Sequence, residues 1–242
     1  MTKVSIKTSA RARKDAGAAR AKSAAASNGG RRRGRPTGTV LDRRDLILSA
    51  ALKLFAVRGY ERTGLHDVAR ATGITRPAIY HYYCSKGQLL FEAVTYGLGQ
   101  LVTRLRQVDA SAFNRPSRHL ATLVRIQALF EIESRGVTPF IDSVLYGPLR
   151  DVADLSSAQK TELRALQREL VEIYRRVLQD GASSGEFDAG NVAVTAFSIL
   201  GMVSHLAVWY REGGELSSDA VATLMGELAQ RLAVGPGASP SR

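Results

Sequence analysis

A glycine between two short helical patterns constrains the fold more than any other feature of the sequence. It is Gly73, in the stretch VARATGITRPAIYHYYCSKGQLL over residues 68–90. The residues before it predict a short helix over 64–72 with Thr63 as its N-cap, and the residues after it predict another helix over 76–82. Glycine accommodates the positive φ that a tight turn requires. The two helices must therefore be close neighbours that share a small core.

The second of these helices has an apolar side and a polar side. Ala69, Gly73 and Ile79 have the spacing of a helix-turn-helix, in which a small residue lets the helices approach and an aliphatic side chain fills the core between them. Thr75 can cap the second helix, and Pro77 is tolerated in its first turn. The side chains left facing outward are those of Thr75, Arg76, Tyr80, His81 and Tyr82. Donors, a cation and flat rings suit phosphates and base edges, so the segment predicts a DNA-recognition helix.

The rest of the chain predicts helices only. From Asp42 to Arg58, apolar residues recur every four positions in two rows, Leu46, Ala50, Leu54 and Ile47, Ala51, Phe55. Further helices are expected over residues 85–108, 117–134, 139–149, 156–180, 191–210 and 218–232. The sequence therefore predicts an all-α fold of about nine helices. We expect a helix-turn-helix domain over 41–88, a helical ligand-binding and dimerisation domain over 89–233, and disordered ends over 1–40 and 234–242.

Residues 42–92 resemble the DNA-binding domain of the tetracycline-repressor (TetR) family of bacterial regulators. The residues that carry the resemblance are Phe55, Gly59, Tyr60, Thr63, Asp67, Val68, Ala69, Gly73, Ile74, Thr75, Ile79, Tyr80, Tyr82, Tyr83, Ser85 and Lys86. Two positions depart from the family pattern: Gly64 replaces a hydroxyl residue, and Tyr83 replaces a core phenylalanine, so that its hydroxyl needs a partner or an exit to solvent.

The resemblance implies roles for eight residues at the DNA. Phosphate contacts would come from Thr63, Thr75, Tyr80 and Lys86, and base contacts from Arg76, Pro77, His81 and Tyr82. Structural alternatives stay open for three of them: Tyr80 could be half core, Lys86 could only follow the cap in the capping box Ser85-Lys86-Gly87-Gln88, and His81 could be an ordinary surface histidine. The implied function is a ligand-responsive transcription regulator, a repressor bound to palindromic double-stranded operator DNA.

The positive charge of the chain is concentrated at its start. Residues 1–40 contain eleven Lys or Arg and one acid, and so carry +10 of the net +12. Within them, Arg33-Gly34-Arg35-Pro36 resembles the core of an AT-hook, in which two guanidiniums lie in a narrow A·T-rich minor groove. We therefore count Arg33 and Arg35 among the DNA-binding residues. A solvated tail is the alternative for residues 1–30, and an architectural protein that binds nucleic acid through this arm alone is the alternative for the whole chain.

The segment over residues 191–210 is apolar almost all round and must be covered on every side. Together with 218–232, it predicts a four-helix interface across a two-fold axis, as a palindromic operator also requires. The expected interface residues of this homodimer are Phe197, Leu200, Val203, Val221, Leu224 and Leu228. A buried core helix in a monomer is the alternative.

The resemblance also implies an effector cavity in the body of the protein, and a bound effector that reorients the fourth helix. The expected wall residues are Leu123, Gln127, Phe130, Phe140, Val144, Tyr146, Met202, His205 and Trp209. Short motifs at Gly185–Phe187, Gly201–Met202 and Trp209–Gly214 resemble the subgroup that senses acyl-CoA thioesters in the breakdown of fatty acids and sterols. An acyl chain suits these mostly apolar walls. A cationic drug or another lipid stays open as the alternative effector, the drug because Glu131, Glu133 and Asp142 are nearby in the sequence.

Several other classes of protein are disfavoured. The single cysteine, Cys84, excludes an internal disulfide and multi-cysteine metal sites, and nothing beside it would activate its thiol. No stretch approaches 18 consecutive apolar residues, so we expect no membrane partner. The four histidines, His66, His81, His119 and His205, lack metal-ligand spacing, and no glycine-rich phosphate loop follows a strand. We therefore expect no enzyme, no cofactor and no metal, in a bacterial cytoplasmic protein associated with the nucleoid.

Overall fold

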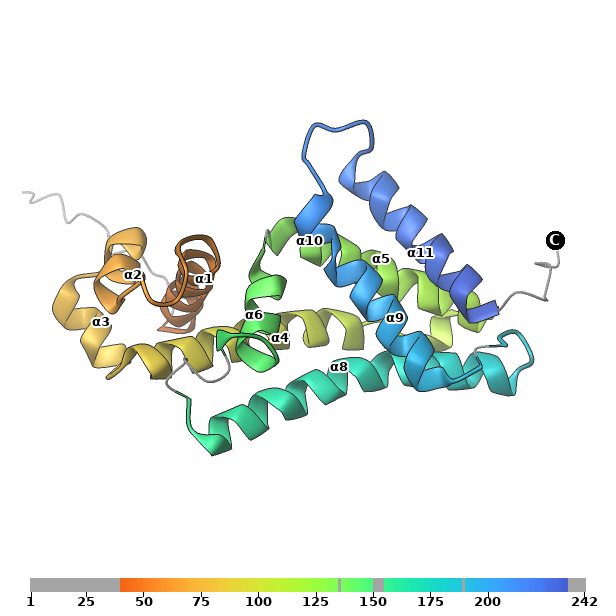
Figure 1. Cartoon of the computed structure of the whole chain (residues 1–242), viewed down its shortest axis with the longest axis horizontal. Coiled ribbons are helices and arrows are strands. Elements are labelled where there is room, and N and C mark those ends of the chain that lie inside the picture. Colours follow the sequence, from red (N-terminus) through yellow and green to blue (C-terminus); the bar gives the residue numbers. More distant parts are fainter. Residues whose placement is uncertain (1–39, 135, 150–154, 189, 235–242) are drawn as a thin grey trace, which may run out of the picture. The chain divides into compact units, whose positions relative to one another are not determined.

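A computed structural model describes residues 40–134, 136–149, 155–188 and 190–234, which belong to one compact unit. The basic arm with Arg33 and Arg35 and the C-terminal tail lie outside the described residues. All regular elements in the described part of the chain are helices (Figure 1). They are α1 (Val40–Arg58), α2 (Leu65–Thr72), α3 (Arg76–Tyr82), α4 (Lys86–Arg106), the 3-10 turn η1 (Ala110–Ala112), α5 (Pro116–Ser134), α6 (Val137–Leu145), α8 (Ser157–Ser183), α9 (Val192–Ser204), α10 (Leu206–Trp209) and α11 (Ser218–Val234).

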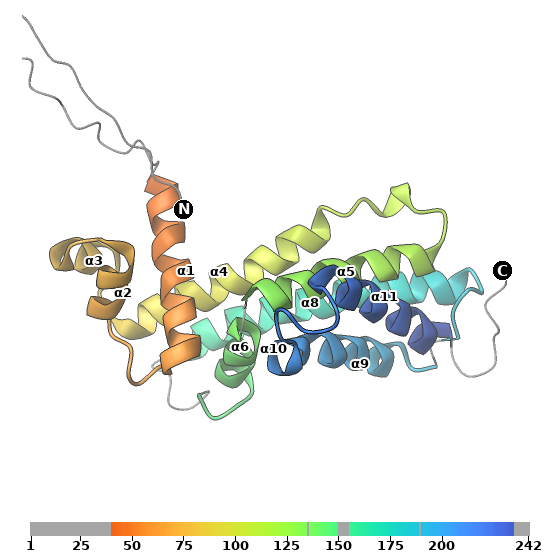
Figure 2. The same ribbon diagram turned by 90° about the horizontal axis from the view of Figure 1, so that it is seen from above.

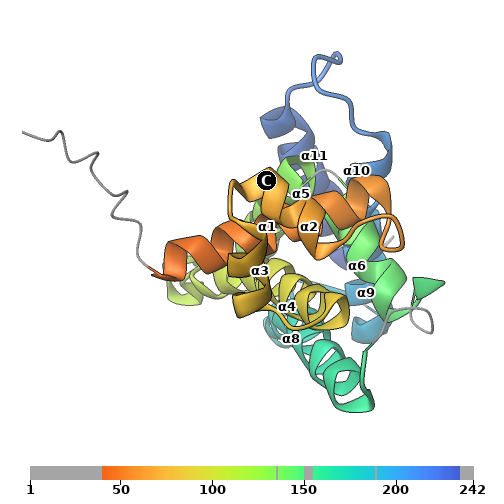
Figure 3. The same cartoon turned by 90° about the vertical axis from the view of Figure 1, so that its left-hand side faces the viewer.

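The first three helices and the start of α4 share one core, which we call the head. Of the two apolar rows expected on α1, the row of Ile47, Ala51 and Phe55 is fully buried. The other row is not, because Leu46 is half exposed to solvent. Ile79 of α3 is also fully buried, as the helix-turn-helix spacing predicts. Figure 3 views the molecule from the end that carries α2 and α3 and shows α1, α2 and α3 in front of α4.

The turn between α2 and α3 follows the prediction, but the start of α2 does not. Gly73 has a φ of 68° and ends α2 in the left-handed conformation. The N-cap position of α2 is Gly64, and the expected N-cap Thr63 is wrong. The hydroxyl of Thr63 is buried and donates to the carbonyl of Gly59 over 2.9 Å, so it cannot serve the helix start. The carboxylate of Asp67 takes over this role from inside the helix, because it accepts a hydrogen bond from the backbone N–H of Gly64 at 3.0 Å.

Helix α4 runs from the head into the rest of the chain, which we call the body (Figures 1 and 2). It contacts α1 on the head side and α5 and α8 in the body. Gly97 lies where α4 crosses α1 and α6, because a Cβ placed there would meet the side chains of Leu52 and Ile141. The body core is formed by α4, α5, α8, α9 and α11, and the contact of α5 with α11 is its most extensive one.

Helix α6 differs from the prediction in both its bounds and its partners. It begins after Gly136, whose φ is 81°, so that Pro139 lies inside its first turn, and it ends at Leu145. One face of α6 carries Phe140 and Val144, which are buried in the core of the head. The ring of Phe140 stacks on Phe55 of α1 with centroids 6.0 Å apart. This short helix of the body is therefore part of the head's core.

The apolar segment over 191–210 forms two helices, α9 and α10, which are separated at His205. The stretch Val192–Trp209 has the length and hydropathy of a membrane span, and only 22% of it is buried inside the structure. Its inward face belongs to the body core, to which it contributes Ala196, Ile199, Leu200, Val203 and Leu206. The segment is therefore interrupted at His205, packs against the body core along one face and leaves its other face uncovered in the single chain.

Candidate functional site

The outward face of α3 is the most prominent polar surface of the head. Arg76, Pro77, Tyr80 and His81 are all exposed, and Tyr80 retains 56% of its accessible surface. Tyr82 is half buried and meets His81 edge to face, with ring centroids 6.3 Å apart. A cation, an imidazole and a phenol therefore project from one side of a helix that Ile79 fixes to the core from the other side.

The start of α3 leaves a hydroxyl available. Thr75 occupies the N-cap position, but its side chain makes no capping hydrogen bond and is exposed. A hydroxyl beside the free N–H groups of a helix start is suited to a phosphate oxygen. Thr63 has no such freedom because its side chain is buried and bonded inside the protein. The structure thus corrects the expectation that Thr63 offers its hydroxyl to the DNA.

Lys86 lies at the start of α4, close to α3. Its ammonium group lies 4.0 Å from the centre of the Tyr60 ring and donates to the carbonyl of Glu61 over 3.2 Å. Ser85 caps the helix start as the sequence predicts, because it accepts a hydrogen bond from the backbone of Gln88. The capping box is incomplete, because the Gln88 side chain accepts from the backbone N–H of Cys84 and not from that of Ser85. The ammonium group is therefore held beside the helix N-terminus, where both would favour an anion.

The substituted core position Tyr83 is fully buried. Burial raises the pKa of its phenol. Of the nearby ion pair, the carboxylate of Glu92 also raises this pKa, whereas the guanidinium of Arg44 lowers it. The Tyr83 hydroxyl makes no hydrogen bond in the described part of the chain, although Arg44 of α1 lies close enough to lower the pKa of the phenol. This neighbour links α1 to α4 at the point where the head joins the body.

The body contains a cavity of about 350 Å³, which we call the body cavity. Five helices contribute to its wall, namely α4, α5, α6, α8 and α9. Its apolar lining residues are Leu98, Leu101, Ile141, Leu145, Leu170, Val171, Phe197 and Leu200, and its polar ones include Gln127, Glu131, Thr138, Asp142, Tyr146, Gln167 and Ser204. An apolar cavity of a few hundred Å³ with a few convergent polar groups is typical of a small-molecule site. Its described lining contains two carboxyl groups and no Lys, Arg or His.

A buried polar chain crosses this wall. The hydroxyl of Tyr174 donates to the side-chain oxygen of Gln127 over 2.7 Å, and the amide nitrogen of Gln127 lies 3.5 Å from one carboxyl oxygen of Glu131. Desolvation raises the pKa of Glu131 to about 8, and hydrogen bonds from Thr138 and Gln127 lower it in part. Desolvation also raises the pKa of Asp142 on the neighbouring α6. These acids therefore sit in surroundings that disfavour negative charge.

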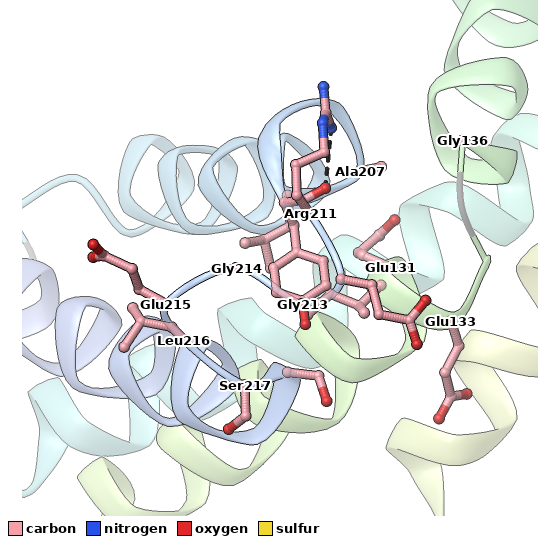
Figure 4. Close-up of a pocket in the computed structure, with 15 residues that line it drawn as sticks. Glu131, Glu133, Gly136, Ala207, Arg211, Gly213, Gly214, Glu215, Leu216 and Ser217 are labelled. Atoms are coloured by element: carbon pink, nitrogen blue, oxygen red, sulfur yellow. Dashed lines mark hydrogen bonds between the residues drawn. The ribbon is translucent and has the colours of Figure 1, made fainter.

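A second cavity, of about 1050 Å³, lies between the end of α5, α10 and the loop over residues 210–217, and we call it the loop cavity. Figure 4 shows Glu131 and Glu133 on one side of it and Glu215, Leu216 and Ser217 on the other. Arg211 is turned back on its own backbone, since it donates to the carbonyl oxygens of Val208 and Tyr210. Glu131 lines both cavities.

Only part of the expected effector wall lines the body cavity. Gln127 and Tyr146 do. The expectation is corrected for Phe140 and Val144, because they are buried in the core of the head and do not line the cavity. It is also corrected for Leu123 and Phe130, which are buried in the body core. The remaining three residues do not line the cavity either: Met202 packs against the body core, and His205 and Trp209 are exposed. The sequence reasoning passed over Ile141 and Leu145, although they share the four-residue spacing of Phe140 and Val144.

The expected interface residues divide into two groups. Leu200, Val203 and Val221 are buried in the body core, so they are not available on the surface. Phe197, Leu224 and Leu228 are exposed, and further exposed apolar residues lie on α9, α10 and α11. We call the resulting set the apolar surface: Val194, Phe197, Val208, Trp209, Leu224, Leu228 and Leu232. The described residues include no cluster of three or more His, Cys, Asp or Glu side chains that could hold a metal ion.

Comparisons with known proteins agree on one family. The family model described as "Bacterial regulatory proteins, tetR family" matches residues 47–93, and the model "Tetracyclin repressor-like, C-terminal domain" matches residues 143–233. The HTH-type transcriptional repressor KstR2 of Mycolicibacterium smegmatis is 30% identical over 182 residues, which are 74% of this chain and 84% of the relative.

Two solved structures show the same fold. The ketosteroid transcriptional regulator KstR2 of Mycobacterium tuberculosis has a TM-score of 0.65 at 23% identity, over 81% of this chain and 97% of that one. AibR in complex with isovaleryl coenzyme A and operator DNA has a TM-score of 0.62 at 24% identity, over 77% of this chain and 97% of that one. The family model that matches residues 47–93 covers most of the head, and the model that matches residues 143–233 covers most of the body from the end of α6 onward.

Proposed function

The chain belongs to the tetR family of bacterial regulatory proteins, whose members regulate transcription by binding DNA, and from this premise we propose that it is a homodimeric repressor that an acyl-CoA thioester releases from a palindromic operator. It would act in the bacterial cytoplasm, on the nucleoid. The observation that carries the proposal is the shared position of α6, which belongs to the core of the head and also lines the body cavity with Ile141 and Leu145.

The surface of α3 supports the DNA-binding part. Arg76 and His81 are exposed on one face and have the donors that read base edges in the major groove. Thr75, Tyr80 and Lys86 flank them with two hydroxyls and an ammonium group, which suit phosphate oxygens. Pro77 and Tyr82 would add apolar contacts to the bases. The arm with Arg33 and Arg35 would reach the adjacent minor groove.

The apolar surface supports the homodimer. Phe197 keeps 61% of its accessible area, and Leu224, Leu228 and Leu232 follow one another at four-residue spacing along α11. Exposed apolar residues that gather on neighbouring helices indicate a surface that another protein covers. A two-fold axis through α9 and α11 would bury them in a four-helix arrangement and set the two α3 helices one DNA turn apart.

The position of α6 supports a switch. Phe140, Ile141, Val144 and Leu145 are all buried in the core of the head, and Ile141 and Leu145 also line the body cavity. A molecule that fills the cavity would contact Ile141, which also packs beside Gly97 of α4, and a larger one would displace it. The displacement would pass to α1 and α4 and change the separation of the recognition helices. A coupling of about 1–3 kcal/mol would lower DNA affinity about 5- to 150-fold.

Two observations favour an acyl-CoA as the effector. The structural neighbour AibR was solved with isovaleryl coenzyme A, and the apolar side of the body cavity fits an acyl chain. A cationic compound is the second candidate, because Glu131 and Asp142 line the same cavity without a basic neighbour in its described lining. To pair with such a compound, Glu131 would have to lose its proton, although its surroundings favour the neutral acid.

A band-shift assay of the purified full chain tests the proposal. The protein is titrated onto its own upstream DNA and onto a shuffled duplex, with and without isovaleryl-, long-chain and sterol-derived acyl-CoAs. We expect selective binding to the upstream DNA that a thioester reverses. Selective binding that a cationic drug reverses and thioesters do not would transfer the effector to the second candidate. Equal binding to both duplexes, with a steep loss on adding salt, would leave only the basic arm and refute the repressor.

A further inference from the structure

The floor of the body cavity carries polar atoms that have no partner in the described part of the chain. Glu131 is fully buried, and its second carboxyl oxygen, Oε2, has no partner at hydrogen-bond geometry there, although Thr138 lies close enough to lower the pKa of the carboxyl. The side-chain oxygen of Gln167 is likewise buried and unpartnered. Both residues line the body cavity, from α5 and from α8. Buried polar atoms without partners destabilise a protein, so a molecule that enters this cavity can stabilise the complex by forming hydrogen bonds with them.

The protonation state of Glu131 decides what kind of atom it can bind. Desolvation raises the pKa of Glu131 to about 8, so most molecules carry a neutral carboxyl there at pH 7. The other carboxyl oxygen, Oε1, faces the amide nitrogen of Gln127 at 3.5 Å and so acts as an acceptor. The proton is therefore best placed on Oε2. A neutral carboxyl of this kind donates a hydrogen bond into an otherwise apolar cavity.

We propose that Glu131 is the polar anchor of the effector and that its protonated carboxyl donates a hydrogen bond to a carbonyl or hydroxyl oxygen on the effector's apolar part. This inference rests on the proposed function and names the effector more narrowly, as an acyl-CoA whose acyl group is oxygenated away from the thioester. The amide of Gln167 and the hydroxyl of Ser204 line the same cavity and can complete the contacts of that oxygen.

The surroundings of Glu131 support a neutral anchor over an ionic one. The charged and titratable groups that face it are Asp142 and Tyr146 from α6 and its C-terminal end, Tyr174 from α8, Glu133 from its own helix, and Tyr210, Arg211, Glu212 and Glu215 from the loop beyond α10. On the body-cavity side these groups are acids and phenols only. The one cation among them, Arg211, lies in the loop cavity and bonds to backbone carbonyls.

The test compares two probes that differ only in the proposed acceptor. Decanoyl-CoA and a set of oxodecanoyl-CoAs, with the keto group moved along the chain, are titrated into the full-length protein by calorimetry. We expect at least one keto isomer to bind about 10- to 100-fold more tightly than decanoyl-CoA, the range for one buried hydrogen bond. Glu131→Leu should abolish this preference. Glu131→Gln, which keeps an uncharged donor of similar shape, should retain much of it.

The pH profile separates an anchor from a structural role. In the wild-type protein the preference for the keto probe should fall as the pH rises through about 8, because the ionised carboxyl no longer donates. It should not change with pH in Glu131→Gln. The matched control is Glu162→Leu, an exposed position of α8 outside both cavities, which should behave as the wild type. Operator binding without effector reports whether each variant is folded. If Glu131→Leu fails that check, the comparison of the wild-type and Glu131→Gln profiles still decides.

The outcomes separate the anchor from the function on which it rests. If the wild type binds decanoyl-CoA and every keto isomer with equal affinity, and Glu131→Leu binds them with that same affinity, the anchor is refuted while the acyl-CoA effector stands. If a preference for a keto probe persists at pH 9.5 in the wild type, the neutral donor is also refuted. If no acyl-CoA binds the wild type at all, the acyl-CoA function fails and the anchor fails with it.

Discussion

Replacing Phe140 by leucine should weaken the response of DNA binding to the effector without weakening effector binding itself. The ring of Phe140 stacks on Phe55 of α1 at 6.0 Å, so it joins α6 to the head. It does not line the body cavity, whereas its neighbour Ile141 does. The substitution therefore changes the contact through which α6 acts on α1 and leaves the wall of the effector site in place.

The structure sets the size of the effect. Phe140 is 7% exposed, and a change to leucine keeps most of its volume, so the free energy of unfolding should fall by less than about 1.5 kcal/mol. Alanine would cost about 3–5 kcal/mol and threaten the fold. The aromatic pair itself contributes about 0.5–1.5 kcal/mol. If the pair is made in only one of the two states, its loss should reduce the effector-induced change in DNA affinity by about 2- to 13-fold.

The assay measures three quantities on each variant. Calorimetry gives the dissociation constant of the acyl-CoA without DNA, anisotropy of a labelled operator gives DNA affinity with and without saturating acyl-CoA, and thermal unfolding gives the loss of stability. Phe130→Leu is the matched control, because Phe130 is equally exposed at 7% but lies in the body core beneath Arg104, away from α1. Equal loss of coupling in both variants, or full coupling in Phe140→Leu, would refute the role of α6.

Three further predictions concern the head and the apolar surface. Arg76→Ala should cost about 1–3 kcal/mol of operator affinity and relax base preference, whereas Lys86→Ala should weaken all sequences about equally; competition band-shifts check both, and identical behaviour would contradict the assigned roles. Phe197→Glu should give a monomer that loses the operator, measured by sedimentation, while Val57→Glu, at a position 78% exposed in the head, should stay dimeric. The hydrogen bond from the Gly64 backbone lowers the pKa of Asp67 in the folded protein below its ordinary value of 3.8. The ionised Asp67 therefore stabilises the fold above pH 3.8, and this stabilisation is lost as the pH falls through the lowered pKa. Asp67→Asn should remove this contribution from the acid unfolding curve.

The head could be predicted closely because its signals are local. The bounds Arg76–Tyr82 of α3 and the positive φ of Gly73 follow from a turn glycine and a buried aliphatic residue at short separation. The predicted N-cap of α2 is wrong because two residues four positions apart can both supply the capping oxygen. Thr63 has the side chain of a cap, but Asp67, one turn into the helix, supplies the carboxylate that the helix start uses.

The effector wall could not be predicted because periodicity does not say which apolar face meets which neighbour. Helix α6 carries two apolar rows one residue apart, Phe140 with Val144 and Ile141 with Leu145. Both are buried in the core of the head, and the second also lines the body cavity. The sequence named the first pair for the cavity, and the structure assigns the second. Only the contact with Phe55, 85 residues earlier in the chain, distinguishes them.

Phe197 connects the two proposals made for the body. Its ring lines the body cavity and also lies on the apolar surface, since 61% of it is exposed in the single chain. If the apolar surface forms the dimer, the partner subunit covers this ring and closes that side of the cavity. Effector binding and dimer formation are then linked, because each changes the surroundings of the same side chain. The effector must also enter elsewhere, and Tyr146, which is 60% exposed where α6 ends, marks another part of the cavity wall that reaches solvent.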